Sequence, residues 1–190
     1  MTKQRTFTGY YNPKNKSKYV GDRRNIYYRS SWERSFCKWC DVNPKVKKWA
    51  IEPFEISYFD RTTRKKRNYN PDFWVEMDSG EKFLVEIKPD YETRPPKMRE
   101  GTPKYLLQEA TYITNTSKWE AADAYCRKKG WKFKVLTEKT LEKMGIKLLK
   151  KIPPMKRKGT SKKNVKYTNG TRIKRKNPTN GRKKVNTSCQ

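Results

Sequence analysis

Three charged side chains near the middle of the chain have the types and spacing that hydrolytic chemistry uses. Asp72 lies on one predicted strand, and Glu86 and Lys88 lie on the next. Residues two apart on a strand share a face, so Glu86 and Lys88 point the same way. The residues Asp-Ser-Gly between the strands predict a hairpin turn. A turn centred on Ser79 places Asp72 opposite Glu86, with Cβ atoms roughly 5 Å apart.

Two carboxylates at that spacing repel each other unless a cation lies between them. A hard divalent cation with oxygen ligands, Mg²⁺ or Mn²⁺, fits the pair formed by Asp72 and Glu86. Lys88 beside it would orient a reacting water or stabilise developing negative charge. The alternative is an ordinary hairpin with a solvated charged face. Two features argue against it: an apolar run at residues 83–85 precedes Glu86, and Pro71 interrupts the strand pattern before Asp72.

Histidine is absent and cysteine is scarce, which limits the chemistry the chain can perform. The sequence has 4 Cys and 0 His. Hydrolases and nucleases that depend on histidine are therefore excluded. Cys37-x-x-Cys40 has the spacing of half a zinc site, but no second pair completes it. We expect buried free thiols in a reducing compartment, and chemistry that uses carboxylates, lysines and a metal ion.

A helix that must position the site is predicted before these strands, over residues 30–41. Ser30-x-x-Glu33 is the pattern of a capping box, which satisfies the first backbone N–H groups of a helix. An apolar stripe follows at helical spacing, formed by Trp32, Phe36, Trp39 and Cys40. Glu33 borders this stripe. It could serve the cap alone, or it could be a third carboxylate that reaches the metal from the helix.

Hydrophobic periodicity and turn residues predict the remaining elements. Strands are expected at residues 46–60, with a bend near Pro53, and at 68–76, 82–88 and 131–136. Helices are expected at residues 104–112, 117–129 and 137–144. Ser117-x-x-Glu120 repeats the capping-box pattern, and Gly130 follows as a helix stop. The loop expected at residues 89–103 is long enough to be functional or mobile.

The charge of the chain is strongly positive. With 48 Lys and Arg against 19 Asp and Glu, the formal net charge is +29. Such a chain binds polyanions, either nucleic acid or an anionic membrane surface. No apolar run approaches the roughly 18 residues that span a bilayer, and the N-terminus lacks the apolar stretch of a secretory signal. A basic turn at residues 61–67 contains Arg64, Lys65, Lys66 and Arg67. It is either a phosphate contact beside the site or a solvated loop.

Composition divides the chain into three parts. Residues 1–28 form a basic, tyrosine-rich arm, which either contacts nucleic acid or packs on the domain as a strap. Residues 29–150 carry the predicted helices and strands. Residues 151–190 hold 14 Lys and Arg and no Asp or Glu. That last segment has too few apolar side chains to form a core, so we expect a disordered basic tail that binds phosphates without sequence specificity.

The order helix, three strands, helix, strand resembles the αβββαβ core of the PD-(D/E)XK nuclease superfamily, an α/β fold with a mixed central sheet. Its motif reads here as Pro71-Asp72 and Glu86-Ile87-Lys88. Further blocks resemble the head-completion nucleases of tailed myophages and, more distantly, the transposon endonuclease subunit TnsA. These blocks lie at residues 27–33, 36, 38–41, 71–74, 118–122, 125–126 and 130–131. The resemblance covers roughly residues 10–145.

The resemblance implies a role for each site residue. Asp72 and Glu86 would be metal ligands, Glu33 a ligand or a partner of the reacting water, and Lys88 the catalytic lysine. Arg29 and Lys118, which lie in the matched blocks, join the basic turn as candidate DNA contacts. The implied activity is hydrolysis of double-stranded DNA with Mg²⁺ or Mn²⁺ and little sequence specificity. No small-molecule cofactor and no membrane partner are expected.

The resemblance also implies a biological setting. The protein would act late in phage head assembly, before the tail joins, in the host cytoplasm or associated with the virion. Portal or connector proteins of the head and neck are the expected protein partners. Two alternatives stay open: a DNA-binding head or neck assembly protein without catalysis, and a nicking or junction-resolving recombination endonuclease.

Overall fold

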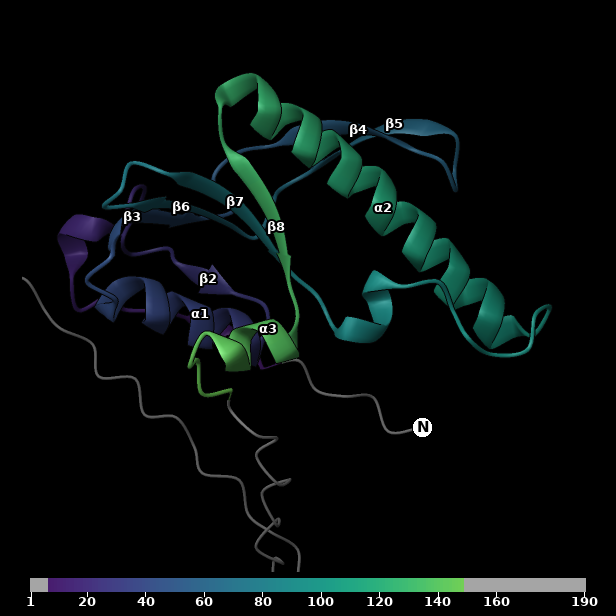
Figure 1. The fold of residues 1–190 in the computed structure, drawn as a ribbon, viewed down its shortest axis with the longest axis horizontal. Coiled ribbons are helices and arrows are strands. Elements are labelled where there is room, and N and C mark those ends of the chain that lie inside the picture. The colour runs from purple at the N-terminus through teal and green to yellow at the C-terminus, as the bar shows by residue number, and fades with distance from the viewer. Residues whose placement is uncertain (1–6, 149–190) are drawn as a thin grey trace, which may run out of the picture. The chain divides into compact units, whose positions relative to one another are not determined.

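The computed structural model describes residues 7–148, in which a four-stranded sheet is covered by helices (Figure 1). The sheet has the order β3-β6-β7-β8. Its strands are β3 (Val46–Ile51), β6 (Phe73–Met77), β7 (Lys82–Ile87) and β8 (Lys132–Leu136). The β3–β6 and β6–β7 pairs are antiparallel, whereas β7 and β8 are parallel. The predicted mixed α/β sheet is therefore confirmed.

The β6–β7 hairpin has the register that its turn residues predict. Phe73 is paired with Val85, and Glu76 is paired with Lys82. Gly80 takes a φ of +84°, a conformation that glycine adopts without steric cost. If this register is continued by one residue beyond Phe73, Asp72 lies opposite Glu86. Both residues are then at the end of the hairpin that is far from the turn.

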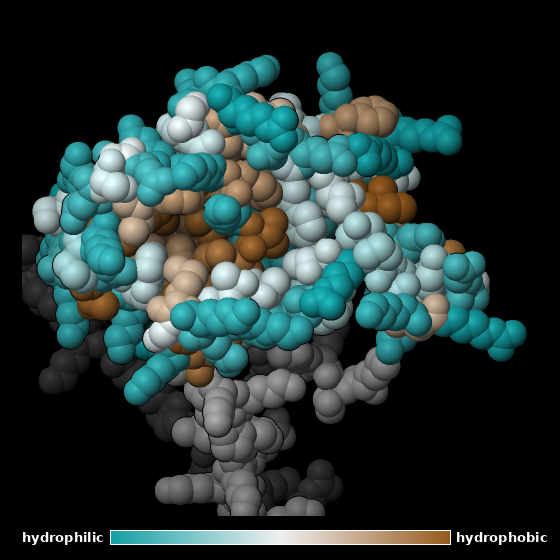
Figure 2. Space-filling model, viewed as in Figure 1, coloured by the Kyte–Doolittle hydropathy of each residue, from teal (hydrophilic) through white to brown (hydrophobic). Residues whose placement is uncertain are grey.

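Two helices cover the two faces of the sheet. Helix α1 (Ser31–Val42) contributes Phe36 to a core that includes Val85 of β7. Helix α2 (Pro103–Lys129) contributes Ala122 and Cys126 to a second core that includes Leu84. Alternate residues of β7 thus face different helices, as the period of a strand requires. Figure 2 shows apolar side chains gathered over the central strands, with hydrophilic ones around them.

The single strand predicted for residues 46–60 is wrong, because the chain leaves the sheet after β3. Glu52 has a φ of +41°, and Pro53 follows it. The chain then forms β4 (Ile56–Asp60), which pairs only with β5 (Lys65–Tyr69) in a separate two-stranded sheet. Lys65, Lys66 and Arg67 therefore lie on a strand and not in a turn.

The two helices predicted between residues 104 and 129 are one 27-residue helix, α2. Its N-cap is Thr102, whose side chain accepts a hydrogen bond from the Tyr105 N–H at 3.2 Å. Ser117 is inside the helix, where its hydroxyl donates to the Ile113 carbonyl at 2.8 Å. Packing against β4 keeps this weakly helix-forming stretch helical. Gly130 ends the helix with a φ of +67°, as predicted.

Short elements complete the described chain. β1 (Gly9–Tyr10) pairs with β2 (Tyr27–Tyr28), and η1 (Lys16–Lys18) lies between them. Buried Asp41 accepts hydrogen bonds from the Tyr11 hydroxyl at 3.0 Å and the Lys14 N–H at 2.7 Å, so this segment packs on α1. Downstream lie η2 (Asp90–Thr93) and α3 (Glu138–Lys143).

The predictions for the cysteines and for the C-terminal tail fall partly outside the described residues. Cys37, Cys40 and Cys126 are buried free thiols, as expected, whereas Cys189 lies outside the described residues. The tail at residues 151–190 also lies outside them, and its disorder stays a prediction. Within residues 7–148, no helix has both the length and the apolar character needed to cross a membrane.

Candidate functional site

The structure brings Asp72, Glu86 and Lys88 together at one end of the sheet. Glu86 and Lys88 lie at the C-terminal end of β7, and Asp72 directly precedes β6. All three line a pocket of about 380 Å³. The other residues that line it are Arg29, Glu52, Tyr69, Asn70 and Lys118. The grouping that strand spacing predicts is thus present in the fold.

Asp72 is held at the end of the β6–β7 ladder. Its Oδ2 accepts a hydrogen bond from the Ile87 N–H at 2.7 Å. Its backbone carbonyl accepts from the Glu52 N–H at 3.0 Å. Pro71, which precedes it, is fully buried and has no N–H to leave unpaired. Backbone contacts to two neighbouring strands therefore fix the Asp72 carboxylate in the pocket.

Glu86 carries a buried carboxylate oxygen without a partner. The residue is 3% exposed, and its Oε1 accepts from the Lys88 ammonium at 3.0 Å. Its Oε2 has no hydrogen-bond partner among the described residues. A buried charged oxygen left unpaired is costly, and such atoms in native proteins usually have a ligand or function. This oxygen belongs to a residue that lines the same pocket as Asp72, so it is suited to a cation.

The electrostatics of the pocket also favour a cation. Burial, followed by the neighbouring Glu86 carboxylate, raises the pKa of Asp72 to about 7. For Lys88, burial would lower the pKa, but the Asp72 and Glu86 carboxylates outweigh it and raise the pKa above its ordinary value. Lys88 therefore stays an ammonium, and its single charge leaves the pair of carboxylates incompletely neutralised.

The donor set fits Mg²⁺ or Mn²⁺. Among residues 7–148, no three acidic or thiol side chains are grouped so that they could hold one ion. Mg²⁺ is commonly held by one or two carboxylates, with water and substrate oxygens as its other ligands. Asp72 and Glu86, with the free Oε2, supply such a two-carboxylate site.

Glu33 lies near this pair but is engaged in the helix cap. Its backbone N–H donates to the Ser30 hydroxyl oxygen at 3.1 Å, and its Oε1 accepts from the same hydroxyl at 2.9 Å. Its Oε2 accepts from the Arg29 N–H at 2.7 Å. Burial raises the pKa of Glu33, and the Asp72 carboxylate adds to the rise. The cap is thus present, and a role toward the metal stays a prediction.

The predicted DNA contacts lie in two places. Arg29 lines the pocket, where its guanidinium donates to Glu52 Oε1 at 2.7 Å. Lys118 lines the pocket from α2, with its ammonium 5.9 Å from the centre of the Tyr58 ring and 5.7 Å from that of Tyr69. The basic residues of the predicted turn are instead on the β4–β5 hairpin, outside the lining of the pocket; they are Arg64, Lys65, Lys66 and Arg67.

Sequence reasoning missed three residues of the pocket: Glu52, Tyr69 and Asn70. Glu52 has a φ of +41°, which is rare for a residue with a side chain and is often found at functional sites. Pro53 signals a break in the strand, but it does not show where the Glu52 side chain points. Tyr69 and Asn70 enter the pocket because β5 ends there.

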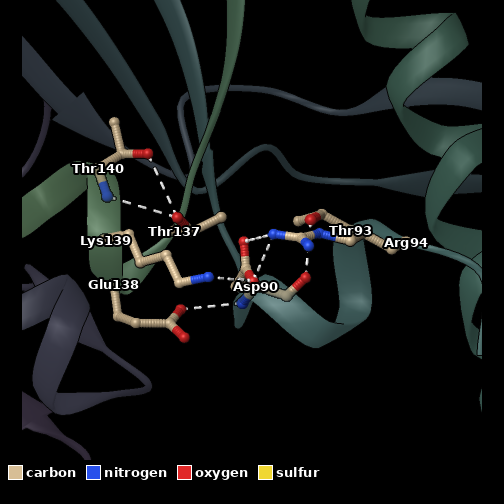
Figure 3. Close-up of polar contacts among 7 residues, drawn as sticks. All are labelled: Asp90, Thr93, Arg94, Thr137, Glu138, Lys139 and Thr140. Atoms are coloured by element: carbon tan, nitrogen blue, oxygen red, sulfur yellow. Dashed lines mark hydrogen bonds and ion pairs between the residues drawn. The ribbon is translucent and has the colours of Figure 1, made fainter. Parts of the chain in front are cut away.

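The segment that follows Lys88 is anchored to α3 (Figure 3). The Asp90 N–H donates to Glu138 Oε2 at 2.9 Å. The Asp90 carboxylate accepts from Arg94 at 2.7 Å and from Lys139 at 2.8 Å. The Lys88 N–H donates to the Leu136 carbonyl at 3.0 Å. These contacts hold the chain on both sides of Pro89 and keep Lys88 at the pocket.

Comparison with known proteins shows the family of the chain. Residues 43–138 match the model of a family described as TnsA-like endonuclease N terminal. The matched range contains Asp72, Glu86 and Lys88 and begins after Glu33. The chain therefore belongs to the TnsA-like endonuclease family.

A particular relative matches a longer part of the chain. The chain is 42% identical over 146 residues to the head completion nuclease of Enterobacteria phage T4. The aligned region covers 74% of this chain and 97% of the phage protein. The resemblance inferred from the sequence motifs is thus confirmed.

Proposed function

We propose that this protein is a metal-dependent nuclease that hydrolyses phosphodiester bonds of double-stranded DNA during phage head completion. The observation that carries the proposal is the unpaired, buried Glu86 Oε2, which lies in one pocket with Asp72 and Lys88. The endonuclease family and the name of the T4 relative support the activity and the setting. The protein would act in the host cytoplasm, or on the virion, with portal or connector proteins nearby.

We assign the fold to the PD-(D/E)XK type. Helix α1, the sheet strands β3, β6 and β7, helix α2 and strand β8 follow in the order αβββαβ. The β4–β5 hairpin is an insertion between the first and second sheet strands. Asp72 and the Glu86-x-Lys88 pair occupy the motif positions at the second and third strands.

The residues of the pocket would have different roles in hydrolysis. Asp72 and Glu86 would hold Mg²⁺ or Mn²⁺, which when bound polarises the phosphate and activates the attacking water. The Lys88 ammonium stabilises the negative charge that grows on the phosphate oxygens in the transition state. Glu33, whose carboxylate is fixed by the cap and is not grouped with Asp72 and Glu86 as a third ligand, would orient the water.

Arg29 and Lys118 add positive charge to the lining of the same pocket. They would hold the phosphates that flank the reacting one. Contacts to phosphates position DNA but carry no sequence information directly. We therefore expect the cutting site itself to have little sequence preference.

Cleavage of defined DNA substrates tests this function. Linear, nicked and branched duplexes would be incubated with purified protein in Mg²⁺, in Mn²⁺ and in EDTA, with Asp72→Ala as the site variant. We expect metal-dependent cleavage of linear duplex that Asp72→Ala abolishes while it still binds DNA. Preference for branched or nicked duplex would favour a recombination endonuclease. Tight binding without cleavage in either metal would favour an assembly protein without catalysis.

A further inference from the structure

The β4–β5 hairpin has two different faces. Its inner face carries the buried side chains of Ile56, Tyr58 and Asp60 and packs on α2. Its outer face carries exposed residues in two cross-strand pairs. These pairs are Ser57 with Asn68 and Phe59 with Lys66. The side chain of Phe59 is thus turned outward, and the residue is 55% exposed.

The hairpin is held firmly on its inner side. Asp60 is 3% exposed, and its carboxylate accepts from the Thr62 N–H at 3.0 Å and the Thr63 hydroxyl at 2.8 Å. The Thr62 hydroxyl is 3.0 Å from that of Thr114 on α2. The Tyr69 hydroxyl donates to the Lys118 carbonyl at 3.0 Å. These contacts make the outer face a preformed surface.

The positive charges near Phe59 are largely free. Arg61 forms an ion pair with Glu120, and Arg67 lies 3.2 Å from Asp60. Arg64, Lys65 and Lys66 form no ion pair with any described residue. One exposed apolar side chain is ordinary on a protein surface. An aromatic ring directly paired with the free Lys66, on a hairpin that also carries free Arg64 and Lys65, is instead suited to a polyanion with apolar surfaces, such as DNA.

The hairpin starts and ends at the pocket. Glu52, four residues before β4, and Tyr69 and Asn70, at the end of β5, all line it. Five strand residues reach about 17 Å from there. Figure 1 shows β4 and β5 extending away from the central sheet alongside α2. A duplex bound at the pocket that continues in this direction would therefore contact the hairpin.

We propose that the outer face of the β4–β5 hairpin docks in the major groove of the duplex that the pocket cuts. This groove, about 12 Å wide, admits a two-stranded ribbon in undeformed B-DNA, whereas the minor groove, about 6 Å wide, must first be widened. Phe59 contacts base edges and thymine methyl groups, and Lys66 and Arg64 contact phosphates. Glu55, which accepts from Asn68 Nδ2 at 3.1 Å, places a carboxylate at the base of the hairpin. Because this carboxylate repels phosphates, the contact with DNA is centred near the turn between β4 and β5.

This inference rests on DNA as the proposed substrate, but its test does not require cleavage. Binding of a labelled duplex to the full chain in EDTA would be measured by fluorescence anisotropy. We expect Phe59→Ala to weaken duplex binding about tenfold through lost apolar contact. Lys66→Ala should lower the slope of log affinity against log salt by about 1. Val42→Ala, at a 49% exposed position on α1, is the matched control and should bind like wild type.

Dimethyl sulfate protection identifies the groove, because it reports on guanine N7 in the major groove. We expect protection by wild type, protection by Val42→Ala, and its loss in Phe59→Ala. Equal duplex affinity and equal protection in wild type and Phe59→Ala would overturn the proposal. So would a Phe59→Ala defect confined to single-stranded DNA, which would make the hairpin a stacking surface. If wild type cuts no DNA in Mg²⁺ or Mn²⁺, the nuclease function fails while these binding results stand.

Discussion

At the scale of single residues, the carboxylates of Asp72 and Glu86 form the proposed metal site. Glu86 is buried and Asp72 is half-buried, and only one of the two Glu86 oxygens is hydrogen-bonded among the described residues. Strand periodicity and the turn at Ser79 predict this pair, because a hairpin register fixes which residues face each other. The Ile87 N–H bond that holds Asp72 follows from the same register.

A bound ion should stabilise the folded protein through these two side chains. We expect Mn²⁺ at 100 times its dissociation constant to stabilise wild type by about 2.7 kcal/mol. Glu86→Gln should abolish this shift because it removes the charge of a ligand. Glu81→Gln, an exposed acid in the β6–β7 turn, is the control and should keep it. Thermal unfolding with and without the metal measures the effect, and an equal shift in both variants would contradict the assignment.

Glu52 is the residue of the pocket that sequence reasoning could not find. Its φ of +41° results from the way the chain leaves β3, which no local pattern encodes. Glu52→Gly and Glu52→Val both remove the ion pair with Arg29, but only glycine takes this φ without strain. We expect the valine variant to be less stable than the glycine variant by about 1–2 kcal/mol in denaturant unfolding. Equal stabilities would show that the substituted chain gives up this backbone conformation.

At the scale of elements, helix α1, the β6–β7 hairpin, β8 and α3 agree with the sequence patterns. The errors arise where tertiary contacts override local preference. The sequence predicts a helix boundary at residues 113–117, but α2 continues through them and packs on β4. Residues 46–60 look like one strand, yet the chain turns at Glu52 and builds a second sheet. The single helix and the second sheet both depend on contacts between distant parts of the chain, so hydrophobic periodicity does not predict them.

The two Ser-x-x-Glu sequences provide a matched test of this explanation. Ser30 caps α1 and holds Glu33, so Ser30→Ala should cost about 1 kcal/mol of stability. Ser117 lies inside α2 and bonds back to Ile113, so Ser117→Ala should change stability by less than about 0.5 kcal/mol. Urea unfolding of both variants measures the difference. A larger loss in Ser117→Ala would mean that α2 has a boundary there.

At the scale of the whole molecule, positive charge should govern the proposed association with DNA. The net charge is +29, and residues 151–190 carry 14 basic residues and no acidic ones. Each phosphate neutralised by a cation releases counterions, which makes affinity fall as salt rises. Deleting residues 151–190 should weaken duplex binding and flatten its salt dependence. Anisotropy titrations at several salt concentrations measure this, and an unchanged slope would mean that the segment contacts something other than DNA.

Cleavage of supercoiled plasmid by wild type and by Lys88→Ala tests the proposed metal-dependent site. Lys88 is proposed to stabilise charge in the transition state without being a metal ligand. We predict nicking or degradation by wild type in Mg²⁺, none in EDTA, and a loss of about 10²–10³-fold in Lys88→Ala, with DNA binding retained. Undiminished cleavage by Lys88→Ala, or cleavage by wild type in EDTA, would contradict the proposed metal-dependent site.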